Sequence, residues 1–183
     1  MNYPLNFVLS LYSILFISFA YSQKIPFPEI SGETIEGNPI TLPAALKTDF
    51  AIIGLAWSKE AEEDLLSWAQ PMYNTFFPQP QKKKGLFDVS YEADVYFIGC
   101  ITGLNKAAAE TIKKKTKHNL DKALHPRMMY YVGDMKPYKE KMGIKDKETC
   151  HIFIVDKNRN IIHYISGKYT AQKMSKIEEL IEE

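Results

Sequence analysis

The stretch AIIGLAWSKEAEEDLLSW, residues 51–68, constrains the fold more than any other part of the sequence. Residues 50–57 are an unbroken apolar run, which predicts a strand buried on both faces, as in a parallel or mixed sheet. Ser58 follows as a suitable helix N-cap, and three glutamates lie in the first turn, where the helix dipole favours negative charge. The helix that we predict from this point has one apolar face, made of Ala61, Leu65, Trp68, Ala69, Met72 and Phe76.

The rest of the chain alternates between strand and helix patterns. Residues 25–46 predict an N-terminal β-hairpin that turns near Gly37. A parallel pair of strands needs a right-handed helical crossover, and a closing hairpin adds two antiparallel strands. The order therefore predicts an α/β three-layer sandwich with a mixed central sheet flanked by helices. The further strands are expected at residues 94–101, 127–132, 150–156 and 161–166, and the further helices at residues 104–117, at residues 137–142 before Gly143, and after Thr170.

Residues 1–22 are a separate segment without any charged side chain. An apolar run from about Phe7 to Phe19 ends in Ala20-Tyr21-Ser22, which fits the small-x-small pattern of a signal peptidase site. We expect a signal peptide cleaved after Ser22, so that residues 23–183 form one exported, periplasmic domain. The alternative is an uncleaved membrane anchor, which would be the protein's one route to membrane contact.

The overall charge argues against a polyanionic partner. The chain has 23 basic and 22 acidic side chains, so no strong positive field is expected. The sequence contains no phosphate-binding loop, dinucleotide fingerprint or zinc-finger spacing. We therefore expect no nucleic-acid partner and no cofactor.

The element order and local sequence resemble the thioredoxin-like superfamily over nearly all of residues 23–183. FPEISGETIEGNPITLPAAL is similar to the lead-in hairpin of its exported members, and CHIFIVDKNRNIIHYISG is similar to their closing strand pair. On the family's WCxxC motif, Trp57 matches the tryptophan, while Ser58 and Ala61 stand at the two cysteine positions. Cys150 stands at the position of the family's cis-proline. The resemblance thus implies the thioredoxin-like fold without its CxxC.

A narrower resemblance is to the thioredoxin-like assembly factors of the mitochondrial ATP synthase membrane sector, which also lack a CxxC. It rests on the segments SWAQPMYNTFF, YYVGDMKPYKEKMGI and VDKNRNIIHYISGKYTAQKMSKIEEL. This resemblance implies a protein partner and a role in assembly.

Dithiol exchange is not expected from these residues. It needs an attacking thiolate and a resolving thiol, and Ser58 supplies neither. The acidic first turn also opposes a thiolate, whose pKa is lowered by positive surroundings.

Cys100 and Cys150 are the two candidate catalytic thiols. In this fold the strand that carries Trp57 lies between them, and two strand spacings of about 9–10 Å exceed the roughly 7 Å limit for a disulfide. We therefore expect them not to be bonded to each other. The alternative to a catalytic role is that Cys100 is a small buried apolar residue and that Cys150 replaces proline sterically.

A metal site at the same end of the sheet would have to use Cys100, Cys150 and His151. Alternation along the strand points His151 away from Cys150, so no metal site is expected. Trp57 either contacts a partner or packs under the N-terminal hairpin, and the sequence leaves both readings open. The expected binding edge consists of Trp57, Ser58, Lys59, Cys150 and His151.

Three functions remain. The first is a binding or assembly module without redox activity, the second is a single-thiol peroxidase or thiol transferase that uses Cys100 or Cys150, and the third is a metallochaperone.

Overall fold

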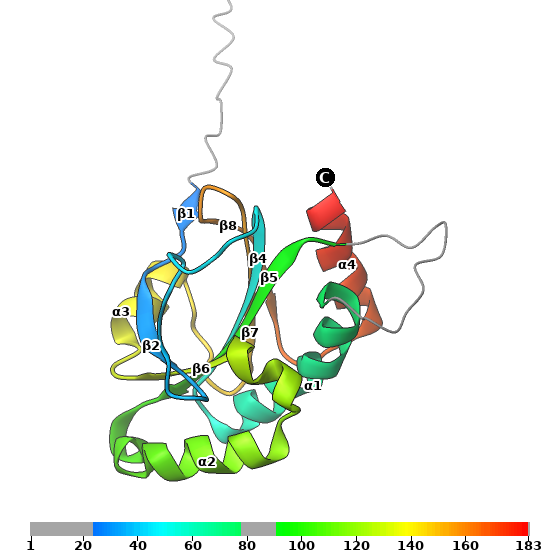
Figure 1. Cartoon of the computed structure of the whole chain (residues 1–183). Helices are drawn as coiled ribbons and strands as arrows, with labels where there is room; N and C mark the ends of the chain where they lie inside the picture. The colour runs from blue at the N-terminus through cyan, green and yellow to red at the C-terminus, as the bar shows by residue number, and fades with distance from the viewer. Residues whose placement is uncertain (1–23, 78–90, 183) are drawn as a thin grey trace, which may run out of the picture.

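The computed structural model describes residues 24–77 and 91–182 (Figure 1). The strands are β1 (Ile25–Pro26), β2 (Ile30–Thr34), β3 (Pro39–Leu42), β4 (Phe50–Ala56), β5 (Ala93–Ile101), β6 (Met128–Val132), β7 (His151–Val155) and β8 (Asn160–Ser166). The α-helices are α1 (Lys59–Phe76), α2 (Ala109–Asn119), α3 (Lys136–Met142) and α4 (Ala171–Glu182), and two 3-10 helices, η1 (Gly103–Ala108) and η2 (Lys122–Arg127), accompany them.

All eight described strands belong to one mixed sheet in the order β1-β8-β7-β4-β5-β6-β2-β3. Strands β4, β5 and β6 run parallel, with α1 as the crossover between the first two. The β7–β8 hairpin adds to the other side of β4 in the antiparallel direction, and β2 and β3 form the N-terminal hairpin. The predicted α/β sandwich with a mixed sheet and an N-terminal hairpin is confirmed.

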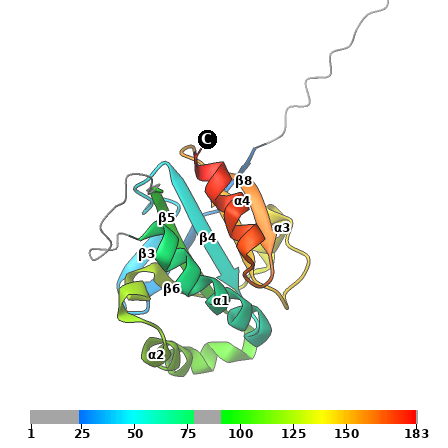
Figure 2. The same ribbon diagram turned by 90° about the vertical axis from the view of Figure 1, so that its right-hand side faces the viewer.

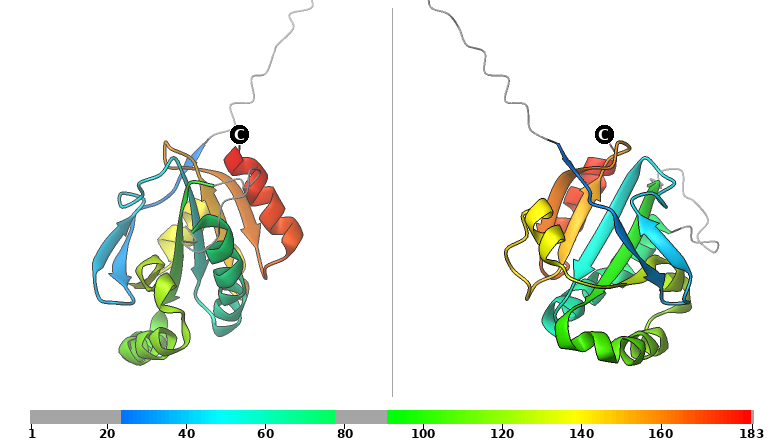
Figure 3. Two further views of the ribbon diagram at one scale, coloured as in Figure 1. Left: turned by 45° about the vertical axis from the view of Figure 1, so that its right-hand side comes forward. Right: turned by 90° about the vertical axis from the view of Figure 1, so that its left-hand side faces the viewer.

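The sheet is covered on both faces, so that the molecule has two hydrophobic clusters. Helices α1 and α4 lie side by side on one face (Figure 2), where they pack on residues such as Ile52 and Ile154. On the opposite face lies α3, and the sheet curls so that its β2–β3 end also covers that face (Figure 3, right), with Ile30, Ile53 and Phe153 in one cluster. This is the three-layer arrangement that the sequence predicted.

The junction between β4 and α1 forms as predicted. The Ser58 hydroxyl accepts a hydrogen bond from the backbone N–H of Ala61 at 3.0 Å, which satisfies one of the free donors of the first turn. The buried residues of the helix are the six that its apolar periodicity indicated, Ala61, Leu65, Trp68, Ala69, Met72 and Phe76.

The helix expected at residues 104–117 differs in detail. It starts as the 3-10 helix η1 and becomes α-helical only at Ala109. Gly103, the first residue of η1, has a left-handed φ of 57° and turns the chain as it leaves β5. Ala109 is the one buried residue of α2, so little packing enforces regular α-helical geometry along this lysine-rich segment.

The proposed signal peptide, residues 1–22, lies outside the described residues. Within residues 24–77 and 91–182, no helix has both the length and the apolar character that a membrane span requires.

Candidate functional site

Trp57 lies directly after β4 and is half-buried. Its indole stacks on the imidazole of His151, with ring centroids 4.9 Å apart and planes 11° apart. His151 in turn stacks on Tyr164 of β8 at 5.7 Å. Trp57 is therefore held against the first residue of β7, and it also packs against the hydrophobic cluster to which Ile30 and Leu42 of the N-terminal hairpin belong.

His151 is buried with both ring nitrogens engaged. Nε2 lies 2.9 Å from the carbonyl oxygen of Asp146, which can only accept, so Nε2 carries the proton. Nδ1 then accepts from the Tyr164 hydroxyl at 2.7 Å. Burial lowers the pKa of His151 from its usual 6.5, which keeps the ring neutral near pH 7. The residue acts as a rigid support beneath Trp57.

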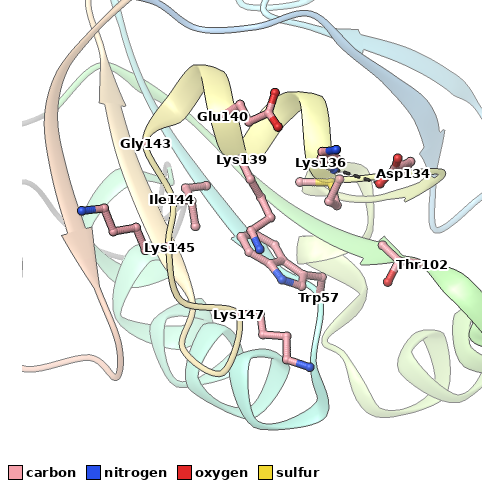
Figure 4. Close-up of a pocket in the computed structure, with 11 residues that line it drawn as sticks. Trp57, Thr102, Asp134, Lys136, Lys139, Glu140, Gly143, Ile144, Lys145 and Lys147 are labelled. Carbon is pink, nitrogen blue, oxygen red and sulfur yellow. Dashed lines mark hydrogen bonds between the residues drawn. The ribbon is translucent and has the colours of Figure 1, made fainter.

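A hollow of about 530 Å³ opens above the indole (Figure 4). The chain reaches this position because α3 ends at Gly143, whose left-handed φ of 68° turns residue 144 back towards Trp57. Met135 and Ile144 are buried beside it and make the interior apolar. The hollow is lined by Trp57, Thr102, Asp134, Met135, Lys136, Lys139, Glu140, Gly143, Ile144, Lys145 and Lys147.

The lining of this hollow has an excess of positive charge, with four lysines against two acidic side chains. One of the acids, Asp134, accepts a hydrogen bond from the backbone N–H of Lys136 at 2.9 Å and so serves the start of α3. The side chain of Lys139 runs towards the indole (Figure 4). Within the described part of the chain, Lys136, Lys139 and Lys145 have no ion-pair partner.

A smaller hollow of about 180 Å³ lies at the amino end of α1. Its lining includes Ser58, Glu62, Asn105 and Tyr130. Burial raises the pKa of Glu62 from 4.5 and that of Tyr130 from 10.0 to about 12, so both shifts favour the uncharged forms of these side chains. Ser58 and Ala61, which the sequence resemblance matches to the two cysteines of a CxxC, lie at this end of α1.

The two cysteines are free and buried, and they lie on opposite faces of the sheet. Strand β4 lies between β5 and β7, as expected, and so separates Cys100 from the start of β7. Burial raises the pKa of the Cys100 thiol far above its usual 9.0. The pKa of Cys150 is raised to about 12, again mainly by burial, and its Sγ donates to the carbonyl of Gly167 at 3.3 Å.

The expected binding edge is corrected by these positions. Lys59 is exposed and Trp57 and Ser58 are half-buried, but Cys150 and His151 are 0% and 1% exposed. Successive residues of a strand point to opposite faces, so Cys150 enters the α1 side and His151 the α3 side. The five residues do not form one surface, and the accessible part is Trp57 with the hollow above it.

The residues proposed for a metal site are not brought together. Cys100 and Cys150 are on different faces, and His151 has no free nitrogen. In residues 24–77 and 91–182, no three His, Cys, Asp or Glu side chains are grouped closely enough to hold a metal ion.

Sequence reasoning missed the contribution of residues 134–147 to the site. The segment YYVGDMKPYKEKMGI supported a family resemblance, but nothing in its spacing placed it above Trp57. The available signal was Gly143 after a short lysine-rich helix, which marks a turn but not its direction.

No family model matches the sequence, and neither does any curated protein. Solved structures do match in fold. Yeast Sco1 is 15% identical, with a TM-score of 0.54 over 87% of this chain and 96% of that chain. A DsbF homologue from Corynebacterium diphtheriae is 14% identical, with a TM-score of 0.53 over 88% and 90% of the two chains. A thio-disulfide isomerase from Thermus thermophilus is 14% identical, with a TM-score of 0.52 over 86% and 95%. The chain therefore has the thioredoxin-like fold.

Proposed function

We propose that this protein is a thioredoxin-fold binding module without dithiol chemistry, which holds a protein partner at the hollow above Trp57. The proposal is carried by one observation: the two residues at the positions that match a CxxC both have structural roles in α1. Ser58 caps α1, and Ala61 is 0% exposed within the core. Neither position has a sulfur atom, and both residues stabilise the helix.

The site at Trp57 supports a binding role. A half-buried tryptophan held rigidly by a stacked ring, beside apolar residues and in a concave surface, is typical of an energetically important contact. The proposed setting is outside the cytoplasm, after removal of residues 1–22. Assembly of a membrane complex is the sharper form of the proposal, and it rests on the sequence resemblance described above.

An insulin-reduction assay with dithiothreitol tests the absence of dithiol chemistry. We expect no turnover above the uncatalysed rate, and the same result for the Cys100→Ser and Cys150→Ser variants, because both thiols are buried. Robust turnover that is lost in Cys100→Ser would contradict the proposal. Binding is tested separately by crosslinking in an extract of the source cells, where a product formed by the wild type should be lost in Trp57→Ala.

A single-thiol enzyme using Cys100 or Cys150 is the main alternative. A reactive thiol needs an accessible sulfur and a pKa near the working pH, whereas burial raises the pKa of both thiols here. Mass spectrometry after mild peroxide treatment separates the two ideas. We expect neither cysteine of the folded protein to be oxidised, and a sulfenic acid at either one would favour the enzyme.

A metallochaperone is the remaining alternative, and one solved structure of yeast Sco1, 16% identical over 86% of this chain, has copper bound. The cysteines and His151 of this chain do not fit such a site, because they lie on different faces of the sheet. Titration with copper or zinc should show no binding near one ion per chain. Binding of one ion per chain would favour the metallochaperone over the proposed binding module.

A further inference from the structure

We infer that the hollow above Trp57 recognises an acidic peptide segment in which an apolar side chain lies next to one or two carboxylates. This inference rests on the proposed function and names the chemistry of the partner at the same site. It follows from three features of the hollow, which are its apolar interior, its unpaired hydrogen-bond donors and the mixture of charges at its rim.

The interior suits an apolar side chain. Trp57, Met135 and Ile144 supply its surface, and the volume of about 530 Å³ lies within the range of roughly 300–1,000 Å³ that is common for ligand sites. Because His151 supports the indole from below, the Trp57 ring is already in place before a ligand arrives. A rigid aromatic surface reduces the entropy lost on binding.

The donors around this interior suit a carboxylate. Within residues 24–77 and 91–182 the indole N–H of Trp57 has no hydrogen-bond partner, and Lys139 approaches the same ring (Figure 4). Among the residues that the structure describes, the one ion-pair partner of Lys147 is the exposed Glu148, at 3.5 Å. An exposed pair of this kind contributes little, so the ammonium group remains available to a ligand.

The rim favours a peptide with few charges over a densely charged surface. Asp134 and Glu140 lie between lysines along the lining, and both would repel an anionic bilayer or a polyphosphate. A ligand with one or two carboxylates can instead place each of them beside a lysine. A neutral peptide would fill the apolar interior but would leave the lysines without an opposite charge.

The test is a titration of the ¹⁵N-labelled protein followed by the two indole N–H signals in its NMR spectrum. Trp68 is fully buried and donates to the carbonyl of Gly167 at 3.0 Å, so its signal serves as an internal reference for the fold. The probe is the peptide acetyl-Gly-Phe-Asp-Glu-amide, and the matched neutral control is acetyl-Gly-Phe-Asn-Gln-amide. Vesicles of anionic phospholipid form a third arm.

We expect the acidic peptide to shift the Trp57 signal to saturation and to leave the Trp68 signal in place. The neutral peptide should bind about tenfold more weakly, and added salt should reduce this difference. Lys139→Gln and Lys147→Gln should each weaken binding of the acidic peptide about two- to fivefold, as for partly exposed ion pairs. Lys141→Gln, which lies on the same short helix but outside the lining, should bind like the wild type.

Equal binding of the acidic and neutral peptides would overturn the inference and leave a binding site at Trp57, as the proposed function requires. A response to the vesicles but not to the peptides would also overturn it, in favour of a lipid. If neither peptide shifts the Trp57 signal, the inference fails, and the proposed function is then decided by the crosslinking comparison with Trp57→Ala.

Discussion

The polar groups at the two ends of strands β4 and β5 differ in whether they are paired within the protein. Near the start of β5, the buried carboxylate of Asp94 accepts hydrogen bonds from the backbone N–H groups of Lys47 and Thr48 and from Arg127, the last at 2.8 Å. The Arg127 guanidinium also lies over the ring of Tyr96, with its Cζ 5.1 Å from the ring centroid. At the other end, the Trp57 indole lines an open hollow, and the side chain of Lys139 runs towards it.

This difference separates stability from function within one sheet. Polar groups that are buried and paired fix the chain, since an unpaired buried group costs free energy. Polar groups that are unpaired at an accessible site do not contribute this free energy to the fold, but they remain available to a partner. Substitutions at the Asp94 end should therefore change the free energy of unfolding, and substitutions at the Trp57 end should mainly change binding.

The largest effect is expected for Asp94→Asn. The change removes the charge of a side chain that is 4% exposed and replaces one of its two acceptor oxygens by an NH₂ group. Either Arg127 or the two backbone N–H groups then face a donor instead of an acceptor. We expect a loss of about 3 kcal/mol in the free energy of unfolding, measured by urea denaturation. A loss below about 1 kcal/mol would show that this end of the sheet is not held by the Asp94 cluster.

The same carboxylate predicts how stability depends on pH. Burial alone would raise the pKa of Asp94, but the hydrogen bonds from Lys47, Arg127 and Thr48 lower it below 3.8. A depressed pKa contributes stability that is present above pH 3.8 and is lost as the pH falls through the pKa of the folded state. The wild type should lose stability on acidification below about pH 4 more steeply than Asp94→Asn, and parallel curves would contradict this.

A smaller effect is expected for Ser58→Ala. The change removes the hydroxyl that accepts from Ala61, and the loss of an N-cap costs about 1 kcal/mol. Ser58→Asp, which retains an acceptor, is the matched control and should unfold like the wild type. If both variants were equally destabilised, the cap would not explain why serine stands at this position.

The smallest effect on stability is expected for Lys139→Gln. Its side chain is half-exposed and has no ion-pair partner in the described part of the chain, so the free energy of unfolding should change by less than about 0.5 kcal/mol. A larger loss would mean that Lys139 supports the fold, and the contrast between the two ends would weaken.

The fold was predictable because its signals are local and strong. The apolar run of β4, the cap at Ser58 and the periodicity of α1 each indicate their element directly, and the order of elements then restricts the sheet. The separation of Cys100 from the start of β7 by β4 followed from that topology.

The site was less predictable because it depends on where a turn sends the chain. The expected edge grouped Cys150 with His151, although the alternation along the strand that was used against a metal site already placed them on opposite faces, as the structure has them. The hollow needs Ile144 and Lys139 above Trp57, and that placement is decided by tertiary packing after Gly143, which no local pattern encodes.

The cap at the start of α1 limits which mutations could introduce a dithiol into this protein. To acquire a CxxC at these positions, the chain would have to replace Ser58, which caps the helix, and Ala61, which has no exposed surface and packs in the core. The first replacement would remove the N-cap hydroxyl. The second would add a sulfur atom to Cβ of residue 61, where the core has no free space. Each step would destabilise the protein before the second thiol gave any activity. A dithiol at these two positions would therefore be hard to introduce one mutation at a time.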